Sequence, residues 1–201
     1  PAPVSKALYS GPMSSQPSRR RRAVVTGASS GIGAATARSL ASAGYEVLCA
    51  ARRADRIEAL AAEIGGRAVV CDVTSADDVA RLAAEVGDRL DVLVNNAGGA
   101  LGLAPAAATD VADWRGMFES NVIGTLQGTQ ALLPALVASG AGTIINVGSI
   151  AGRVAYEGGS GSIAAQHAVA AITETLPLER VCHPARIEKI GRTEFEEARA
   201  V

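Results

Sequence analysis

Short, almost wholly apolar runs alternate along the chain with longer stretches in which apolar residues recur every three or four positions. The apolar runs predict strands at residues 23–26, 45–51, 67–72, 90–96 and 143–149. The helical periodicity predicts helices at about 32–43, 55–64, 76–87, 111–138 and 161–176. Apolar strands that alternate with helices are typical of a parallel sheet covered on both faces. We therefore expect a single α/β domain over residues 23–201, with a Rossmann-type, doubly wound parallel β-sheet in three α/β/α layers.

The first 22 residues do not follow this pattern, and we expect them to form a disordered basic leader rich in Pro and Ser ahead of the domain. Residues 1–18 contain four of the eight prolines together with several serines and glycines, a composition that predicts a disordered leader. Residues 19–22 are four consecutive arginines. Such a run could contact nucleic acid, but without interleaved aromatic residues it is more typical of a solvated charge cluster. We expect no nucleic-acid partner.

Composition narrows the class of protein further. Apolar residues make up 48% of the chain and aromatic residues 3%, so the core must be built from Ala, Val, Leu and Ile. The net charge of −1 gives no overall attraction to nucleic acid or anionic membranes. No apolar run approaches the roughly 20 residues that span a bilayer, so we expect a cytoplasmic protein without a membrane partner.

The three cysteines, Cys49, Cys71 and Cys182, are odd in number and widely spaced. Cys49 and Cys71 each lie near the end of an apolar run that predicts a strand. Buried free thiols in a reducing compartment are therefore expected rather than a disulfide. We expect no metal site.

A glycine-rich loop follows the first predicted strand in the sequence "TGASSGIG", residues 26–33. Glycines at such a turn let the backbone approach a pyrophosphate, and the helix that follows offers its N-terminal N–H groups to the anion. The loop lies between a strand and a helix, which is the context that makes this signal strong. It predicts a dinucleotide site that uses Gly27, Ser29, Ser30, Gly31, Ile32 and Gly33.

The end of the second predicted strand indicates which dinucleotide binds. A carboxylate at this place usually holds the ribose 2′-hydroxyl of NAD, but this chain has Arg52 and Arg53 there. Guanidinium groups suit the 2′-phosphate of NADP, because they combine charge with forked donors. The alternative is that both arginines are merely solvated at a strand end. We expect NADP(H), with NAD(H) as the less favoured cofactor.

Five motifs together resemble the short-chain dehydrogenase/reductase family: "TGASSGIG", "CDVT" at 71–74, "NNAG" at 95–98, "SNVIG" at 120–124 and "NVGSIAG" at 146–152. The resemblance implies seven parallel strands, NAD(P)(H) binding, and hydride transfer between nicotinamide and a small carbonyl or alcohol substrate. It also implies the roles of several residues. Asp72 and Val73 would flank the adenine, Asn95, Ala97 and Gly98 would line the cofactor cleft, and Asn121 and Ser149 would belong to a catalytic Asn-Ser-Tyr-Lys set.

The same resemblance implies that the tyrosine and the lysine of that set are replaced. The family has its tyrosine 13 residues after the serine and its lysine four residues later, where this chain has Ser162 and Gln166. Tyr156 lies too close to Ser149 to take over, and His167 is expected to be a packing or surface residue. A serine hydroxyl is a weak acid and glutamine carries no charge, so we expect impaired catalysis. The alternative is a catalytically inactive protein that binds the cofactor or acts as a scaffold.

The C-terminal part also departs from the family pattern. Pro177 interrupts the helix predicted from about residue 161, and the segment "RIEKIGRTEFEEARAV" lacks the Pro-Gly turn that follows the family's sixth strand. The resemblance therefore implies a shortened C-terminal part with an altered last strand and substrate lid. In the family, helices equivalent to 111–138 and 161–180 commonly pair across a two-fold axis, which implies a homodimer or homotetramer.

Overall fold

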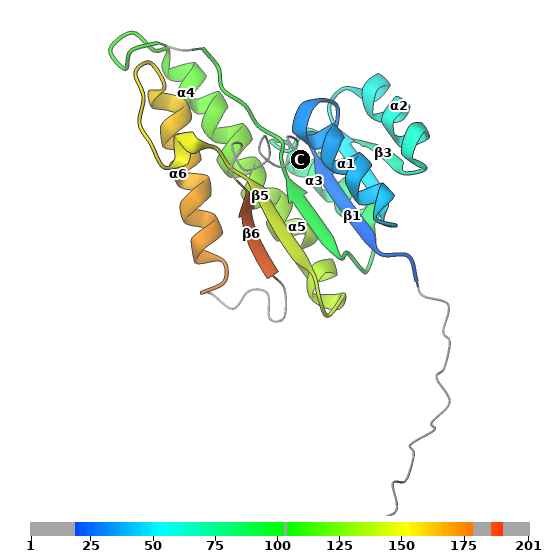
Figure 1. Ribbon diagram of the computed structural model, residues 1–201. Coiled ribbons are helices and arrows are strands. Elements are labelled where there is room, and N and C mark those ends of the chain that lie inside the picture. The colour runs from blue at the N-terminus through cyan, green and yellow to red at the C-terminus, as the bar shows by residue number, and fades with distance from the viewer. Residues whose placement is uncertain (1–18, 103, 179–185, 191–201) are drawn as a thin grey trace, which may run out of the picture.

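A six-stranded parallel sheet in the strand order β3-β2-β1-β4-β5-β6 lies at the centre of the molecule (Figure 1). The computed structural model describes residues 19–102, 104–178 and 186–190. The strands are β1 (Arg22–Thr26), β2 (Glu46–Ala51), β3 (Arg67–Val70), β4 (Val92–Asn95), β5 (Thr143–Val147) and β6 (Arg186–Ile190). The helices are α1 (Gly31–Ser42), α2 (Ala54–Ile64), α3 (Ala76–Val86), α4 (Val111–Phe118), α5 (Gly124–Ala138) and α6 (Ser160–Thr175). The Rossmann-type fold predicted from the sequence is confirmed.

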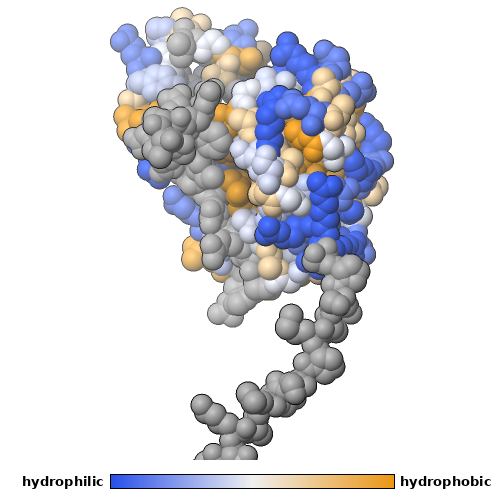
Figure 2. Space-filling view, turned by 45° about the vertical axis from the view of Figure 1, so that its right-hand side comes forward, coloured by the Kyte–Doolittle hydropathy of each residue, from blue (hydrophilic) through white to orange (hydrophobic). Residues whose placement is uncertain are grey.

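The two faces of the sheet are buried under different helices because successive strand residues point in opposite directions. On one face, Val24 of β1 and Leu48 of β2 pack with α3 and α5, where Leu82 and Leu136 are buried. On the other face, Val25 and neighbouring strand residues pack with α1 and α2. Hydrophilic residues gather on the outer side of the molecule that carries α1 and α2 (Figure 2). Because helices bury both faces of the sheet, the domain has the three layers that were predicted.

Most element boundaries agree with the sequence-based expectations to within one or two residues. β1 begins at Arg22, one residue earlier than we expected, because this arginine lies against the body of the domain. Its backbone N–H donates to Asp91 and its guanidinium pairs with Glu46 at 3.1 Å. Arg21 stacks on the Tyr45 ring at 4.3 Å and Arg19 lies 3.6 Å from Asp88. Of the leader expected over residues 1–22, residues 1–18 lie outside the described residues.

Two of our expectations about strands need correction. β3 ends at Val70, whereas we expected a strand over 67–72. Asp72 instead begins a turn, in which its carboxylate accepts hydrogen bonds from the Thr74 backbone and hydroxyl. β6 pairs with β5 in parallel register, although the charged segment "RIEKI" gave no strand signal. β6 is the last strand at its edge of the described sheet, where β5 is its strand neighbour. A seventh strand is not among the described residues.

The region predicted as one helix over 111–138 is interrupted. A five-residue π-helical segment, η1 (Glu119–Ile123), separates α4 from α5. Such π-helical segments are rare and occur frequently at functional sites. This one contains Asn121, which we selected as a candidate catalytic residue.

Pro177 lies two residues beyond the end of α6 instead of interrupting it. The helix ends at Thr175 and the backbone N–H of Leu178 donates to the Thr175 carbonyl, so Pro177 removes no helical hydrogen bond.

Cys49 and Cys71 are buried and unpaired, as we expected. Burial raises the pKa of each thiol to about 11, which makes both poor nucleophiles at neutral pH. Cys182 lies outside the described residues. Within the part of the chain that the structure describes, no helix has the length and apolar character needed to cross a bilayer.

Candidate cofactor-binding cleft and active site

The loop between β1 and α1 brings the backbone close to the loop that follows β4. Gly27 has φ +65°, and a Cβ at this position would lie 2.9 Å from the Ala97 Cα. A Cβ at Gly33 would clash with the Gly27 carbonyl oxygen. Ser30 begins α1 without a side-chain capping bond. The N–H groups of the first helical turn therefore remain without side-chain partners at the edge of the cleft, where an anion would be stabilised.

Thr26 connects the two loops. Its hydroxyl accepts hydrogen bonds from the backbone N–H groups of Asn96 and Ala97, both at 3.0 Å, and donates to the Val94 carbonyl at 3.3 Å. The Asn96 side chain returns a hydrogen bond to the Thr26 carbonyl at 3.0 Å. The sequence motif does not reveal that Thr26 connects the two loops, because nothing in it shows which backbone groups approach the threonine.

A cleft of about 930 Å³ runs along the carboxyl ends of the strands. This is the edge at which ligands bind in open α/β sheets. All but one of the site residues selected from the sequence line it: Gly27, Ser29, Ser30, Gly31, Ile32, Arg52, Arg53, Asp72, Val73, Asn95, Ala97, Gly98, Asn121, Ser149, Ser162 and Gln166. The exception is Gly33, which packs beneath the loop against Gly27.

Two arginines mark one end of the cleft. The Arg53 guanidinium donates to the hydroxyls of Ser29 and Ser30, each at 2.7 Å, which holds it beside the glycine-rich loop. Arg52 is 79% exposed at its side chain and lies 4.0 Å from the Asp72 carboxylate. Because this contact between Arg52 and Asp72 is long and solvent-exposed, it is weak, and the Arg52 charge remains available to an incoming anion.

Asn121, Ser149, Ser162 and Gln166 lie at the other end of the cleft. The π-helical segment presents the Asn121 side chain, whose amide donates to the carbonyls of Gly99 at 2.8 Å and Met117 at 2.7 Å. Its oxygen accepts from the Gly99 N–H at 3.1 Å and from the Gln166 amide at 3.3 Å. Asn121 thus joins the loop after β4 to α6. The Ser149 hydroxyl accepts from the Ala151 N–H at 3.2 Å.

The Gln166 side-chain oxygen is buried and has no hydrogen-bond partner within the described residues. Its orientation follows from Asn121, because the Asn121 oxygen requires a donor and therefore receives the NH₂ group of Gln166. A buried acceptor without a partner is costly. Because Gln166 lines the cleft, a ligand hydroxyl is the kind of donor that would satisfy it.

Two other titratable side chains near this end, those of His167 and Tyr156, do not line the cleft. His167 is exposed, and its Nδ1 lies 2.9 Å from the Ile163 carbonyl oxygen on the same helix. The ring of Tyr156 packs against Gly159. No group of three metal-ligating side chains occurs among residues 19–102, 104–178 and 186–190.

The described part of the cleft shows which charges are available for chemistry. Its charged lining residues are Arg52, Arg53, Asp72 and Glu119, and the only other ionisable side chain is the Cys71 thiol. The cleft lining therefore presents neither a phenol nor an ammonium group beside Ser149.

The sequence pattern of the family described as short chain dehydrogenase matches residues 21–191. The chain is 52% identical over 181 residues to an uncharacterized oxidoreductase of Mycobacterium tuberculosis, covering 88% of this chain and 72% of that protein. It is 42% identical over 142 residues to serine 3-dehydrogenase of Agrobacterium fabrum, covering 68% of this chain and 57% of that enzyme. Among solved structures, the closed form of serine dehydrogenase complexed with NADP⁺ superposes with a TM-score of 0.77 at 33% identity, covering 85% of this chain and 71% of that one.

Proposed function

The chain belongs to the short-chain dehydrogenase family of oxidoreductases, and from this premise we propose that it binds NADP(H) and transfers hydride slowly. The substrate would be a small carbonyl or alcohol compound. The observation that carries this proposal is the pairing of two arginines at one end of the cleft with Ser162 and Gln166 at the other. Arg53 and Arg52 supply positive charge for the NADP phosphate, whereas Ser162 and Gln166 occupy the places where the family has tyrosine and lysine.

The residues present fit a nicotinamide dinucleotide. A Cβ at Gly31 would meet nothing within 4 Å, so the loop backbone is open there to a pyrophosphate. Gln166 offers its unpaired buried oxygen to a ribose hydroxyl. The bound cofactor would supply the hydride donor or acceptor. The relative solved with NADP⁺ supports the choice of the phosphorylated form.

We expect the protein to bind NADPH at least about tenfold more tightly than NADH, because a phosphate bound by guanidinium gains charge-assisted hydrogen bonds worth about 1.5–3 kcal/mol. Arg53→Ala should remove most of this preference. Arg56→Ala, an exposed arginine one turn further along α2, is the matched control and should retain it. Isothermal titration calorimetry with both cofactors measures the effect. Equal affinities in the unaltered protein, or no binding of either cofactor, would contradict the proposal.

The expected slow chemistry follows from the groups at the reaction end. Carbonyl reduction requires a proton donor at the oxygen as hydride reaches the carbon. The Ser162 hydroxyl is a far weaker acid than a phenol, and the neutral Gln166 amide provides no positive charge to lower a neighbouring pKa.

The same observation supports a second candidate, a catalytically inactive member of the family that binds the cofactor or acts as a scaffold. Turnover measurements with NADPH distinguish the two.

We also propose a homodimer or homotetramer that forms through α4, α5 and α6. Val111, Trp114 and Phe118 recur at helical spacing on α4 and are 60%, 37% and 42% exposed. Val137 near the end of α5 is also exposed. Apolar side chains gathered on one helical face are typical of an interface.

Phe118→Glu should shift the assembly to monomer, because the interface would have to bury an unpaired charge. Val70→Glu makes the same change at an exposed position on β3, away from these helices, and should leave the assembly intact. Sedimentation velocity at micromolar concentration measures both. A monomeric unaltered protein would contradict this part of the proposal.

A cytoplasmic location is proposed as well. Cys49 and Cys71 are buried and unpaired, which fits a compartment that keeps thiols reduced.

A further inference from the structure

We propose that a small pocket beside Ser162 selects substrates with a cationic ammonium group, which the Asp113 carboxylate binds. This inference deepens the proposed function and rests on it, because the pocket lies beyond the reaction end of the cofactor cleft. Ser162 lines both the cleft and the pocket. A molecule in the pocket would therefore lie beside the residue that occupies the place of the family's proton donor.

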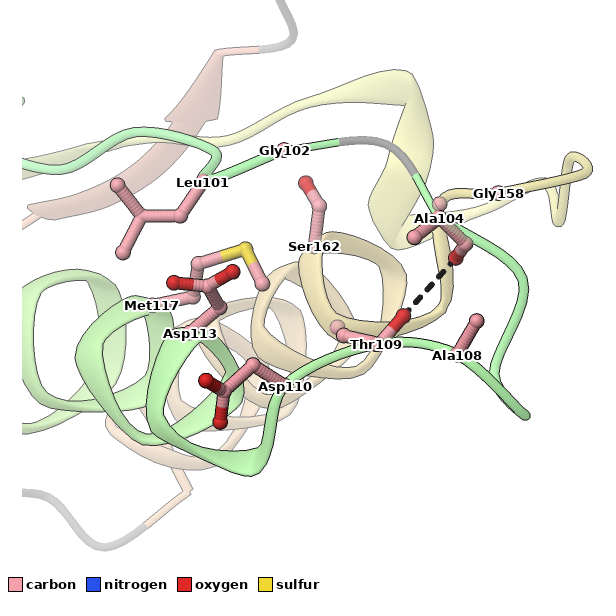
Figure 3. Close-up of a pocket in the computed structure, with 12 residues that line it drawn as sticks. Leu101, Gly102, Ala104, Ala108, Thr109, Asp110, Asp113, Met117, Gly158 and Ser162 are labelled. Atoms are coloured by element: carbon pink, nitrogen blue, oxygen red, sulfur yellow. Dashed lines mark hydrogen bonds between the residues drawn. The ribbon is translucent and has the colours of Figure 1, made fainter.

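Two separate stretches of the chain form this pocket (Figure 3). The first is the loop after β4 together with the helix α4 that directly follows it, and the second, later in the chain, is the start of α6. The described lining residues are Leu101, Gly102, Ala104, Ala108, Thr109, Asp110, Asp113, Met117, Gly158, Gly159, Gly161 and Ser162. Thr109 fixes the loop, because its hydroxyl donates to the Ala104 carbonyl at 3.0 Å.

The dimensions of the pocket limit the size of the ligand. Its volume of about 190 Å³ corresponds to about six water molecules at the liquid's ~30 Å³ each. Pockets that bind drug-sized ligands have volumes of about 300–1,000 Å³. The pocket therefore fits a compact substrate. The part of the substrate that extends into the pocket from the reacting carbon would have few non-hydrogen atoms.

The two carboxylates in the lining have different roles. Asp110 is the N-cap of α4 and accepts a hydrogen bond from the Ala112 N–H at 2.8 Å. Asp113 is half-buried, and within the described residues its carboxylate has no hydrogen-bond or ion-pair partner. One Asp113 oxygen lies 4.0 Å from the point where a Cβ on Gly102 would be. Figure 3 shows Asp113 and Met117 on α4, with Leu101 on the loop above them and Ser162 on the neighbouring helix α6.

Asp113 has a structural role that is compatible with ligand binding. It lies in the first turn of α4, where the helix dipole favours a negative charge by about 0.3–1 kcal/mol. The helix N-terminus provides no charged hydrogen-bond partner for this carboxylate. The charge of Asp113 is therefore available to a cation in the pocket.

The small pocket and the far end of the neighbouring cleft carry charges of opposite sign. Asp110 and Asp113 are the only charged side chains among the described residues that line the pocket. Arg52 and Arg53 lie at the far end of the neighbouring cleft. Leu101 and Met117 line the pocket beside Asp113, and the Asp113 charge attracts a cation and repels a carboxylate. An ammonium group is the compact cation that fits this volume and donates hydrogen bonds to a carboxylate.

Binding of three small probes to the NADPH-loaded protein tests this inference. The probes are 2-aminoethanol, ethylene glycol and glycolate, which have similar sizes but are cationic, neutral and anionic. Saturation-transfer NMR titrations give their dissociation constants without any need for turnover. We expect 2-aminoethanol to bind about tenfold more tightly than ethylene glycol, and glycolate to bind most weakly.

Asp113→Asn should abolish the preference for 2-aminoethanol while NADPH affinity stays unchanged. Asp77→Asn alters an exposed carboxylate in the first turn of α3, which does not line the pocket, and should keep the preference. Equal binding of the cationic and neutral probes to the unaltered protein overturns the inference, even if the Asp113 variant does not fold. A preference that survives in Asp113→Asn also overturns it. If NADPH itself does not bind, the proposed function fails, and this inference fails with it.

Discussion

Replacing Ser162 by Tyr and Gln166 by Lys together is expected to raise the rate of NADPH-dependent carbonyl reduction by about 10²–10⁴-fold, the usual contribution of a positioned general acid. Both residues line the reaction end of the cleft, and Gln166 contacts Asn121 at 3.3 Å. A phenol at position 162 would supply the proton. An ammonium group at position 166 would lower the pKa of that phenol from its reference value near 10 toward neutral pH.

The single changes should recover far less than the pair. Ser162→Tyr alone leaves a phenol with an unaltered pKa, and Gln166→Lys alone provides a positive charge with no acid to activate. Residues that act as a unit are strongly non-additive, so the double variant should exceed the product of the two single effects. Steady-state kinetics with a panel of small aldehydes and ketones measures this.

A matched control separates acid catalysis from a change in pocket shape. The pair Ser162→Phe with Gln166→Lys has nearly the same volume as the active pair but has no hydroxyl. It should stay as slow as the unaltered protein. If the unaltered protein already reduces carbonyls at the ordinary enzyme rate of about 1–10³ s⁻¹, another group supplies the proton and the proposal of impaired catalysis is wrong.

Thr26→Val is expected to lower the free energy of unfolding by about 2–4 kcal/mol, although the two side chains have nearly the same shape. The Thr26 hydroxyl is the acceptor for the N–H groups of both Asn96 and Ala97, and Thr26 is 2% exposed. Each buried donor that loses its partner costs about 1–3 kcal/mol. The estimate lies below the sum of two full penalties because both hydrogen bonds are only partly buried.

Thr125→Val is the matched control for this change. Thr125 is also buried, but its hydroxyl only donates to the Asn121 carbonyl one helical turn away, so no backbone N–H loses its acceptor. Its loss of stability should be about 1 kcal/mol or less. Urea denaturation followed by circular dichroism measures both variants. NADPH affinity should fall in Thr26→Val as well, because Ala97 lines the cofactor cleft. Equal stabilities for the two variants would contradict the role assigned to Thr26.

The difference between predicted and observed strands has a physical explanation. The strands at the centre of the sheet, β1, β2, β4 and β5, were found from sequence because burial on both faces requires continuous apolar runs. β6 is not among the apolar runs and was implied only by the family resemblance; among the described strands it pairs with β5 only. The end of β3 was misplaced because Asp72 turns the chain through side-chain hydrogen bonds that hydrophobicity does not reveal.

The sequence by itself determined the alternation of strands and helices, the glycine-rich loop and the arginines that follow β2. It could do so because each of these signals is local, set by residues within one element or turn. Only the tertiary structure decided that η1 would present Asn121 to Gln166, that Thr26 would join two loops, and that Asp113 would line a pocket with Ser162. These contacts join residues 45 to 70 positions apart in the first two cases. They arise because the parallel sheet gathers the carboxyl ends of its strands at one edge, and no local pattern specifies which side chains meet there.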